Sequence, residues 1–256
     1  MKITLVPSSV TERTRDQHQY LTTFLINDNI AIDAGCLGLM GTAQDQARIQ
    51  HVFLTHAHID HIGSLPVFVE NVYEEGSYSV TIHGSGHLLQ CLKQDIFNDR
   101  VWPDFVSLSR PEDPFLKLAV LEPGRTVEVE GVRITPVPVD HVVPTFGFLI
   151  EDERAAVAIV TDTGPSDAIW ERANALPKLK AVFLEATFPE ALSWLAEASK
   201  HLTPSKFAGE VQKLARPATI YAIHLKARFR AEIIKELKAL RLADLKIAQF
   251  GRPYSF

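Results

Sequence analysis

Short hydrophobic runs that each end in a histidine or a carboxylate constrain the fold of this chain more than any other feature. Runs of this length, bounded by polar residues, are typical of buried β-strands. The residues that end them are His56 after "HVFLT", His141 after "ITPVPVD", Asp162 after "VAIVT", Glu185 at the end of "AVFLE" and His224 after "TIYAI". Because loops at the carboxyl ends of strands assemble functional sites, we expect these side chains to contribute to one site.

Other patterns complete the expected architecture. "YLTTFLIND" and "NIAIDAG" predict a hairpin that turns at Asn27, Asp28 and Asn29. Helical patterns cover residues 64–75, 87–97, 189–199, 204–214 and 227–240, and Thr203-Pro204 supplies an N-cap and a first-turn proline for the fourth. Strands in both halves of the chain with helices outside predict an α/β fold of two packed sheets flanked by helices. No Gly/Ser-rich linker divides residues 1–256, so a single domain is expected.

Composition narrows the partners and the compartment. The chain carries 26 Lys and Arg against 31 Asp and Glu, a formal net charge of -5, without a long basic run. A nucleic-acid partner is not expected, because binding a phosphate backbone takes many clustered cations. A membrane partner is not expected either, because no apolar stretch approaches the roughly 20 residues of a span. Cys36 and Cys91 are too few for a disulfide framework and the start lacks a signal-peptide core, which predicts a cytoplasmic protein.

The segment "THAHIDHIGSLP" holds the densest group of candidate ligands. His56 and His58 can turn toward one ion, while Asp60 and His61 project elsewhere and can serve a second. Imidazole nitrogen and carboxylate oxygen suit Zn²⁺, and also Mn²⁺ or Fe²⁺. The alternative is a polar surface loop without a metal. Four ligand-type residues within six, after a hydrophobic strand, favour half of a two-metal site.

The pattern HxHxDH resembles the signature of the metallo-β-lactamase superfamily. That family adds a third His, a bridging Asp and a last His, and the chain has His141, Asp162 and His224 in this order. The resemblance implies an αββα sandwich with two divalent ions, zinc first and manganese or iron as alternatives. It implies one ion at His56, His58, His141 and Asp162, and another at Asp60, His61, His224 and Asp162. Asp33 in "AIDAG" resembles a structural Asp of that fold, which supports the metal loop.

Two further motifs resemble the phosphodiesterase branch of the superfamily. "LEATFP" is similar to its "HEATF"-like strand end, and "KHLTPSKFAGEV" to its histidine-bearing helix start. Two cations that share a hydroxide lower its pKa and neutralise charge on a phosphoryl group, but the leaving alkoxide still needs a proton. His201 is the best acid outside the metal set, and Glu185 can orient its ring. The candidate catalytic residues are Asp60, His201 and Glu185, and the alternative for His201 is a helix cap.

Two families share these motifs, the class II 3′,5′-cyclic-nucleotide phosphodiesterases and the tRNA 3′-processing endonucleases. The tRNA enzymes carry a long arm between the third His and the bridging Asp, whereas only about twenty residues separate His141 from Asp162. The stretch "QCLKQDIFNDRVWPDF" instead resembles the "IFN…WPDF" stretch of the cyclic-nucleotide enzymes. Trp102, Phe105 and Phe97 are therefore candidates for a wall against the nucleobase, with hydrophobic packing as the alternative.

Together these features predict a binuclear hydrolase that opens cAMP or cGMP to the 5′-monophosphate, with the bridging hydroxide attacking phosphorus and O3′ leaving. Its expected partner is a small cyclic nucleotide, and a homodimer is an open alternative to a monomer. The alternative functions are an RNA phosphodiesterase without the arm, a small-ester or lactone hydrolase, and a cyclic-nucleotide binding module with a degenerate site. The remaining histidines His18, His51, His83 and His87 lack ligand-type neighbours and are expected at the surface or in the core.

Overall fold

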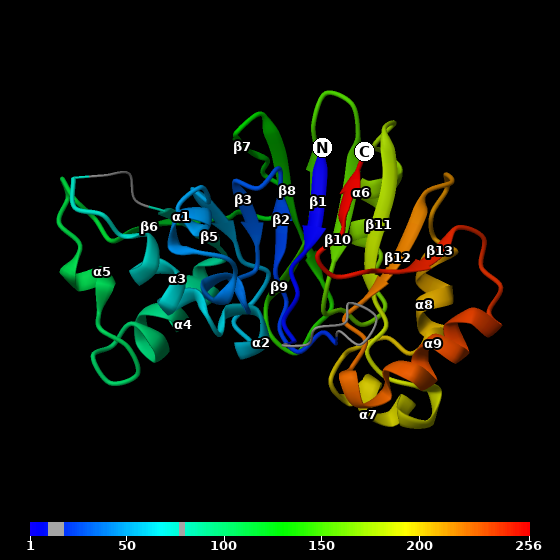
Figure 1. Ribbon diagram of the computed structural model, residues 1–256. Coiled ribbons are helices and arrows are strands. Elements are labelled where there is room, and N and C mark those ends of the chain that lie inside the picture. Colours follow the sequence, from blue (N-terminus) through cyan, green and yellow to red (C-terminus); the bar gives the residue numbers. More distant parts are fainter. Residues whose placement is uncertain (10–17, 77–79) are drawn as a thin grey trace.

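The hydrophobic runs fold into two sheets that pack face to face (Figure 1). The computed structural model describes residues 1–9, 18–76 and 80–256, and within these ranges each sheet has seven strands. The first sheet has the order β14-β1-β2-β3-β4-β5-β6, with bounds Pro253–Ser255, Lys2–Leu5, Phe24–Ile26, Ile30–Ile32, His51–Phe53, Val80–Gly84 and Leu116–Val120. The second has the order β13-β12-β11-β10-β9-β8-β7, with bounds Leu245–Ile247, Thr219–Ile223, Leu179–Glu185, Ala156–Val160, Thr145–Glu151, Val132–Val139 and Val127–Val129.

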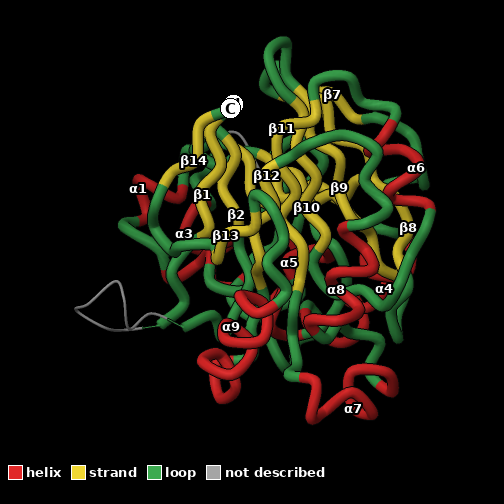
Figure 2. The backbone as a smooth tube through the Cα atoms, turned by 90° about the vertical axis from the view of Figure 1, so that its right-hand side faces the viewer, coloured by secondary structure: helices red, strands yellow, loops and turns green. Residues whose placement is uncertain are grey.

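Helices flank the sandwich on both sides (Figures 1 and 2). Beside the first sheet lie α1 (Ala43–Gln46), α2 (Ile59–Ile62), α3 (Leu65–Val72), α4 (Gly86–Cys91) and α5 (Phe105–Leu108), and α4 continues as a π-helical turn over Leu92–Ile96. Beside the second lie α6 (Ala168–Asn174), α7 (Ser193–Ala198), α8 (Pro204–Val211) and α9 (Arg230–Ala239). Both views place α7 and α9 beyond one end of the sandwich. The predicted two-sheet αββα architecture is confirmed.

Three apolar layers hold these elements together. Between the sheets, Phe24 meets Phe183 edge to face at 5.6 Å, and Phe53 meets Phe148 in the same way at 6.0 Å. A second layer packs the first sheet against its helices, with Phe68 in α3 fully buried, and a third packs the second sheet against α6, α8 and α9. Each fully buried side chain of this size contributes roughly 1.5–3 kcal/mol of transfer free energy. The repeated pattern of apolar strands thus produces four stacked layers.

The predicted hairpin is confirmed, and its turn shows why these residues stand there. β2 and β3 pair antiparallel, with Phe24 opposite Ile32. Asn27 and Asp28 have φ of 50° and 65°, a left-handed conformation that Asn and Asp tolerate better than other residues with a side chain. Two consecutive residues with positive φ match the twist of a tight hairpin.

All five predicted helices are present, with ends that differ from the predicted ones by up to four residues. At the start of α8, Pro204 stands in the first turn as expected, but the Thr203 side chain makes no capping hydrogen bond. Its Oγ1 lies instead 3.2 Å from the Ser205 hydroxyl. Several strands were not predicted, among them β1, β13 and β14, because strands of three or four residues leave too short a pattern.

Strand direction brings the polar strand ends together. β10, β11 and β12 are mutually parallel, and β8 runs the same way because two antiparallel pairings with β9 separate it from β10. The residues after these strands therefore meet at one edge of the second sheet. In the first sheet, β4 delivers the histidine-rich segment, and the Phe146 N–H donates to the Thr55 carbonyl at 3.1 Å, which joins the sheets beside that edge. Within the described ranges, no helix has the length and apolarity to cross a membrane.

Candidate metal centre

The predicted ligands converge from both sheets. His56, His58, His141 and Asp162 form one group in which the potential ligand atoms all lie within 4.8 Å of one another. Asp60, His61, Asp162 and His224 form a second group by the same measure. These are the two sets that the family resemblance implies, and they share Asp162.

Asp162 lies between the two groups and turns one oxygen to each. Its Oδ2 is 3.6 Å from Nε2 of His56 and 3.9 Å from Nε2 of His141. Its Oδ1 is 3.3 Å from Nε2 of His61 and 3.5 Å from Nε2 of His224. The carboxylate is 1% exposed, so its charge is shielded from water. This geometry is that of a ligand able to bridge two cations.

A buried carboxylate of the first sheet orients one imidazole from each group. Asp33 Oδ2 lies 2.6 Å from Nδ1 of His61. The Thr55 hydroxyl lies 2.9 Å from both Asp33 oxygens and 2.9 Å from Nδ1 of His56. Since a carboxylate only accepts, the hydroxyl donates to Asp33 and accepts from His56. Both rings therefore present Nε2 without a proton, as a metal ligand requires.

The second sheet repeats this arrangement with Glu185. Its Oε1 lies 2.7 Å from Nδ1 of His201 and also accepts from the Thr163 N–H. Its Oε2 accepts from the Thr187 hydroxyl, which lies 2.9 Å from Nδ1 of His224. Glu185 is fully buried, and its oxygens are occupied by these donors, so it orients its neighbours and is not free to be a ligand.

His141 and His58 complete the first group. Nδ1 of His141 lies 3.2 Å from the carbonyl oxygen of Lys200, to which it donates, so that Nε2 carries the free lone pair. That Nε2 lies 3.3 Å from Nδ1 of His58. The Lys200 ammonium pairs with Asp140 at 2.6 Å and ties together the two loops that carry His141 and His201.

The donor set fits metal ions on an observation independent of any family. Nε2 of His56, Nε2 of His61 and Oδ1 of Asp162 are buried and have no hydrogen-bond partner in the part of the chain that the structure describes. Leaving a buried polar atom without a partner costs about 1–3 kcal/mol. The three atoms lie close together, and the two histidine rings have fixed tautomers. Cations bound among these atoms would explain why they lack hydrogen-bond partners.

His201 stands beside this centre without belonging to either ligand group. Its Nε2 lies 4.0 Å from Oδ2 of Asp162. Burial lowers the pKa of His201, but the carboxylate of Glu185 outweighs that effect and the pKa is raised overall. Burial likewise raises the pKa of Asp162, but its electrostatic interactions with His224 and His61 hold that pKa well below its usual range. Cations bound at Asp162 would push the pKa of His201 down again.

The three aromatic residues predicted to contact a nucleobase lie in or against one apolar layer. Phe97 is fully buried and Phe105 is 6% exposed, and both belong to the layer between the first sheet and its helices. Trp102 is half-buried against the same layer. These positions favour hydrophobic packing for Phe97 and Phe105, and a contact between Trp102 and a substrate stays a prediction.

The other histidines do not join the centre. His83 is buried and stacks on Phe53 with the ring centroids 4.1 Å apart. His51 shares a hydrogen bond with it, His87 is exposed, and His18 is half-buried. None belongs to a metal-binding group within the described residues.

Sequence reasoning missed three residues that hold the ligands. Thr55 and Thr187 carry the hydroxyls that link a carboxylate to a ligand histidine, and Gln19 accepts a hydrogen bond from the backbone of His224. Thr55 immediately precedes the histidine-rich segment and Thr187 follows Glu185 by two residues, so proximity to the motifs could have indicated both. No pattern marks Gln19.

Comparison with known proteins agrees with this geometry. The model of the family described as "Beta-lactamase superfamily domain" matches residues 29–225. A probable 3′,5′-cyclic-nucleotide phosphodiesterase of Yersinia pestis is 25% identical over 224 residues, 77% of this chain and 62% of the relative. 3′,5′-Cyclic-nucleotide phosphodiesterase 1 of Saccharomyces cerevisiae is 40% identical over 89 residues, 34% of this chain and 22% of the relative. The chain thus spans less than two thirds of the length of both.

A ribonuclease Z of Lacticaseibacillus casei is 29% identical over 116 residues, 45% of this chain and 34% of that protein. Among solved structures, unliganded yeast PDE1 superposes with a TM-score of 0.76 at 19% identity, covering 98% of both chains. At that identity the superposition establishes the fold alone.

Proposed function

The chain belongs to the β-lactamase superfamily, and we propose that it is a metal-dependent hydrolase, a binuclear phosphodiesterase that opens 3′,5′-cyclic nucleotides to 5′-monophosphates. The observation that carries the proposal is Asp162, which turns one carboxylate oxygen to each of two ligand groups. Two cations suit a phosphodiester, because its negative charge is spread over the phosphoryl oxygens and each cation can contact one of them. Two relatives named as cyclic-nucleotide phosphodiesterases support this substrate class.

The two ions would be held by His56, His58, His141 and Asp162 on one side and by Asp60, His61, His224 and Asp162 on the other. Zinc is the first candidate, because neutral imidazole nitrogens dominate the donor set. When bound, such ions lower the pKa of a shared water and neutralise charge on the phosphoryl oxygens. Asp33 and Glu185 fix the tautomers of His56, His61 and His224, which leaves Nε2 of these three rings free to face the centre.

His201 would supply the proton that the departing O3′ needs. The Glu185 carboxylate holds Nδ1, so the exchangeable proton on Nε2 points to the side of Asp162. A carboxylate partner also favours the protonated ring, the form that can give a proton. We assign Asp60 as a ligand of the second ion and so as part of the catalytic centre. Its Oδ2 lies 3.4 Å from Nε2 of His224.

An RNA phosphodiesterase is the second candidate, and the match to ribonuclease Z favours it. β9, β10 and short loops take up all the residues between His141 and Asp162. No residues remain between them for a tRNA-binding arm. The full ligand set also argues against a binding module with a degenerate site. No feature of the site favours a lactone or another small ester.

The test is metal analysis of the purified protein coupled to a hydrolysis screen. The substrates are cAMP, cGMP, cyclic dinucleotides, pre-tRNA and bis-p-nitrophenyl phosphate. We expect two ions per chain and turnover of a cyclic mononucleotide to its 5′-monophosphate. Release of a tRNA 3′ trailer without cyclic-nucleotide turnover would reverse the ranking of the two candidates.

A further inference from the structure

We propose that Gln19 is a positioning residue that joins the two sheets behind the metal centre and holds Asp60 and His224 at the spacing of the second ion. The inference rests on the proposed binuclear site and deepens it, since it assigns Gln19 to one ion position only. Gln19 is 8% exposed, and it makes a hydrogen bond to a residue 205 positions away in the chain.

The backbone at His224 needs support from outside its own strand. β12 ends at Ile223, and His224 has φ of 54°, a left-handed conformation that is unfavourable for a residue with a Cβ. Its N–H donates to Oε1 of Gln19 at 2.8 Å. The Thr187 hydroxyl lies 3.2 Å from its carbonyl oxygen, but the proton of that hydroxyl goes to Glu185. The Gln19 side chain thus holds a peptide N–H that the sheet no longer pairs. In this conformation Nε2 of His224 lies 3.4 Å from Asp60.

The other end of the Gln19 amide is tied to the opposite sheet. Nε2 donates to the Thr22 hydroxyl at 3.0 Å, and the Thr22 N–H donates to the carbonyl oxygen of Asp60 at 2.7 Å. A Cβ at Gly35 would lie 2.1 Å from that oxygen and 2.7 Å from the Thr22 nitrogen, so the contact is tight and leaves little room to shift. A continuous path therefore runs from the backbone of His224 through Gln19 and Thr22 to the backbone of Asp60.

This path serves one ligand group and not the other. Asp60 and His224 both belong to the second group. His56 is held by Thr55 and His141 by the carbonyl of Lys200, through contacts that do not involve Gln19. Removing the hydrogen bonds of Gln19 should therefore weaken the binding of the second ion and leave the binding of the first ion unchanged.

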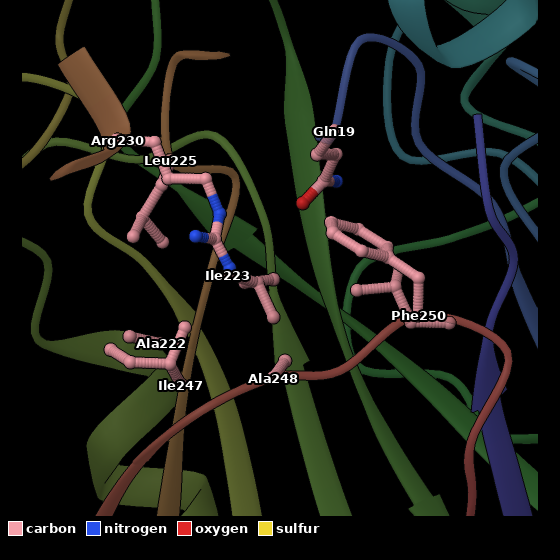
Figure 3. A pocket seen from close by; sticks show the side chains of 9 residues that line it. Gln19, Ala222, Ile223, Leu225, Arg230, Ile247, Ala248 and Phe250 are labelled. Atoms are coloured by element: carbon pink, nitrogen blue, oxygen red, sulfur yellow. The ribbon is translucent and has the colours of Figure 1, made fainter. Parts of the chain in front are cut away.

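The surroundings of Gln19 suit a substitution that removes its hydrogen bonds without a large change of packing. Figure 3 shows Gln19 on one wall of a small pocket, with Ile223 and Arg230 across from it and Ala248 and Phe250 below. Most of these neighbours are apolar. A methionine at position 19 has similar length and flexibility, so Gln19→Met deletes both hydrogen bonds at a small steric cost.

The experiment measures the affinity of the wild type and of Gln19→Met for Zn²⁺, using competition with a chelator at fixed pH. We expect the wild type to bind two ions, and Gln19→Met to bind one ion unchanged and the other about 10- to 100-fold more weakly, the usual cost of removing an outer partner. Gln19→Glu keeps an acceptor for the His224 N–H, so it should recover part of the loss. Asp60→Asn should weaken the same ion as Gln19→Met.

Gln46→Met is the matched control for a merely structural effect. Gln46 is 3% exposed and also uses both ends of its amide, on the Met40 carbonyl and on Asn71, but it lies outside the ligand groups. It should lower thermal stability without changing either zinc affinity. The proposal is overturned if Gln19→Met leaves both affinities unchanged, if it weakens both equally, or if the wild type binds fewer than two ions.

The zinc measurement involves no substrate, so the inference and the proposed function fail separately. Selective loss of one ion in Gln19→Met, in a protein that turns over no cyclic nucleotide, would support the positioning role and reject the phosphodiesterase. Cyclic-nucleotide turnover with equal zinc affinities in both proteins would do the reverse.

Discussion

At the scale of the single residue, the centre depends on which atom of each side chain is left free. Asp33 and Glu185 each accept a hydrogen bond directly from one histidine. Each also accepts from a threonine hydroxyl that contacts Nδ1 of a second histidine. The free Nε2 atoms then point at Asp162, whose own Oδ1 has no hydrogen-bond partner among the described residues. Removing the shared ligand Asp162 should therefore change the metal content, whereas removing the acid His201 should change the rate.

Asp162→Ala should lose both ions, because the carboxylate faces both groups and its negative charge would offset part of the charge of both cations. Metal content after gel filtration, read by mass spectrometry, measures the loss. Asp167→Ala is the control, since that carboxylate is 81% exposed and pairs with Lys213 at the surface. Retention of two ions by Asp162→Ala would contradict the bridging role.

His201→Ala should keep both ions but lower kcat by ~10²- to 10⁴-fold, the range for a positioned general acid. The loss should shrink for bis-p-nitrophenyl phosphate, because p-nitrophenolate leaves without a proton. Glu185→Gln should show a weaker form of the same pattern, since the amide can still contact Nδ1. His87→Ala, at an exposed position, serves as the control. Equal slowing of good and poor leaving groups would rule out the acid role.

At the scale of the element, the pairing of β4 with β5 buries a histidine that the reaction does not use. The His83 ring stacks on Phe53 and shares a hydrogen bond with His51 on the neighbouring strand. Burial, together with the charge of His51, lowers the pKa of His83 to about 4. The strand pair therefore favours a neutral ring, and folding is linked to pH through it.

The sign of this linkage follows from the lowered pKa. Between the unfolded value near 6.5 and the folded value of about 4, the unfolded chain binds a proton that the folded chain does not. The contribution of this group to stability is complete above the unfolded pKa and falls as pH drops through this window, by roughly 3 kcal/mol. Urea titrations of wild type and His83→Gln, both with chelator present, should show a flatter acid limb in the variant. Parallel curves would contradict the assignment.

At the scale of the whole molecule, the centre is a junction between the two sheets. His56, His58, Asp60 and His61 follow β4 of the first sheet, whereas His141, Asp162 and His224 follow β8, β10 and β12 of the second. Each ligand group therefore contains residues from both sheets. Ions bound there would cross-link the halves of the sandwich and stabilise the folded chain.

Chelation should therefore lower the melting temperature, and added zinc should restore it. An ion present at 100 times its Kd adds about 2.7 kcal/mol of stability, if it binds the folded chain alone. Calorimetry across a series of free zinc concentrations measures the effect. Asp162→Ala should melt at the same temperature with and without chelator. A melting temperature of the wild type that is independent of zinc would contradict a structural contribution of the ions.

The sequence by itself determined the class of fold, the ligand set and its order. Strand periodicity marks β4, β8, β10, β11 and β12, because alternating or continuous apolar runs record which stretches must be buried. The residues that end these strands then follow from position alone. HxHxDH, with His141, Asp162 and His224 behind it, resembles a known superfamily, and that resemblance implied both ligand groups that the fold brings together.

Only the tertiary structure decided which atoms are free and which groups hold them. It placed Phe97 and Phe105 in a core layer, a position that favours hydrophobic packing for both. It also brought Gln19 to His224, and it turned the two oxygens of Asp162 to opposite groups. Local pattern records burial and strand direction, but a hydrogen bond between residues 205 positions apart depends on where two sheets come to lie, and no stretch of sequence contains that information.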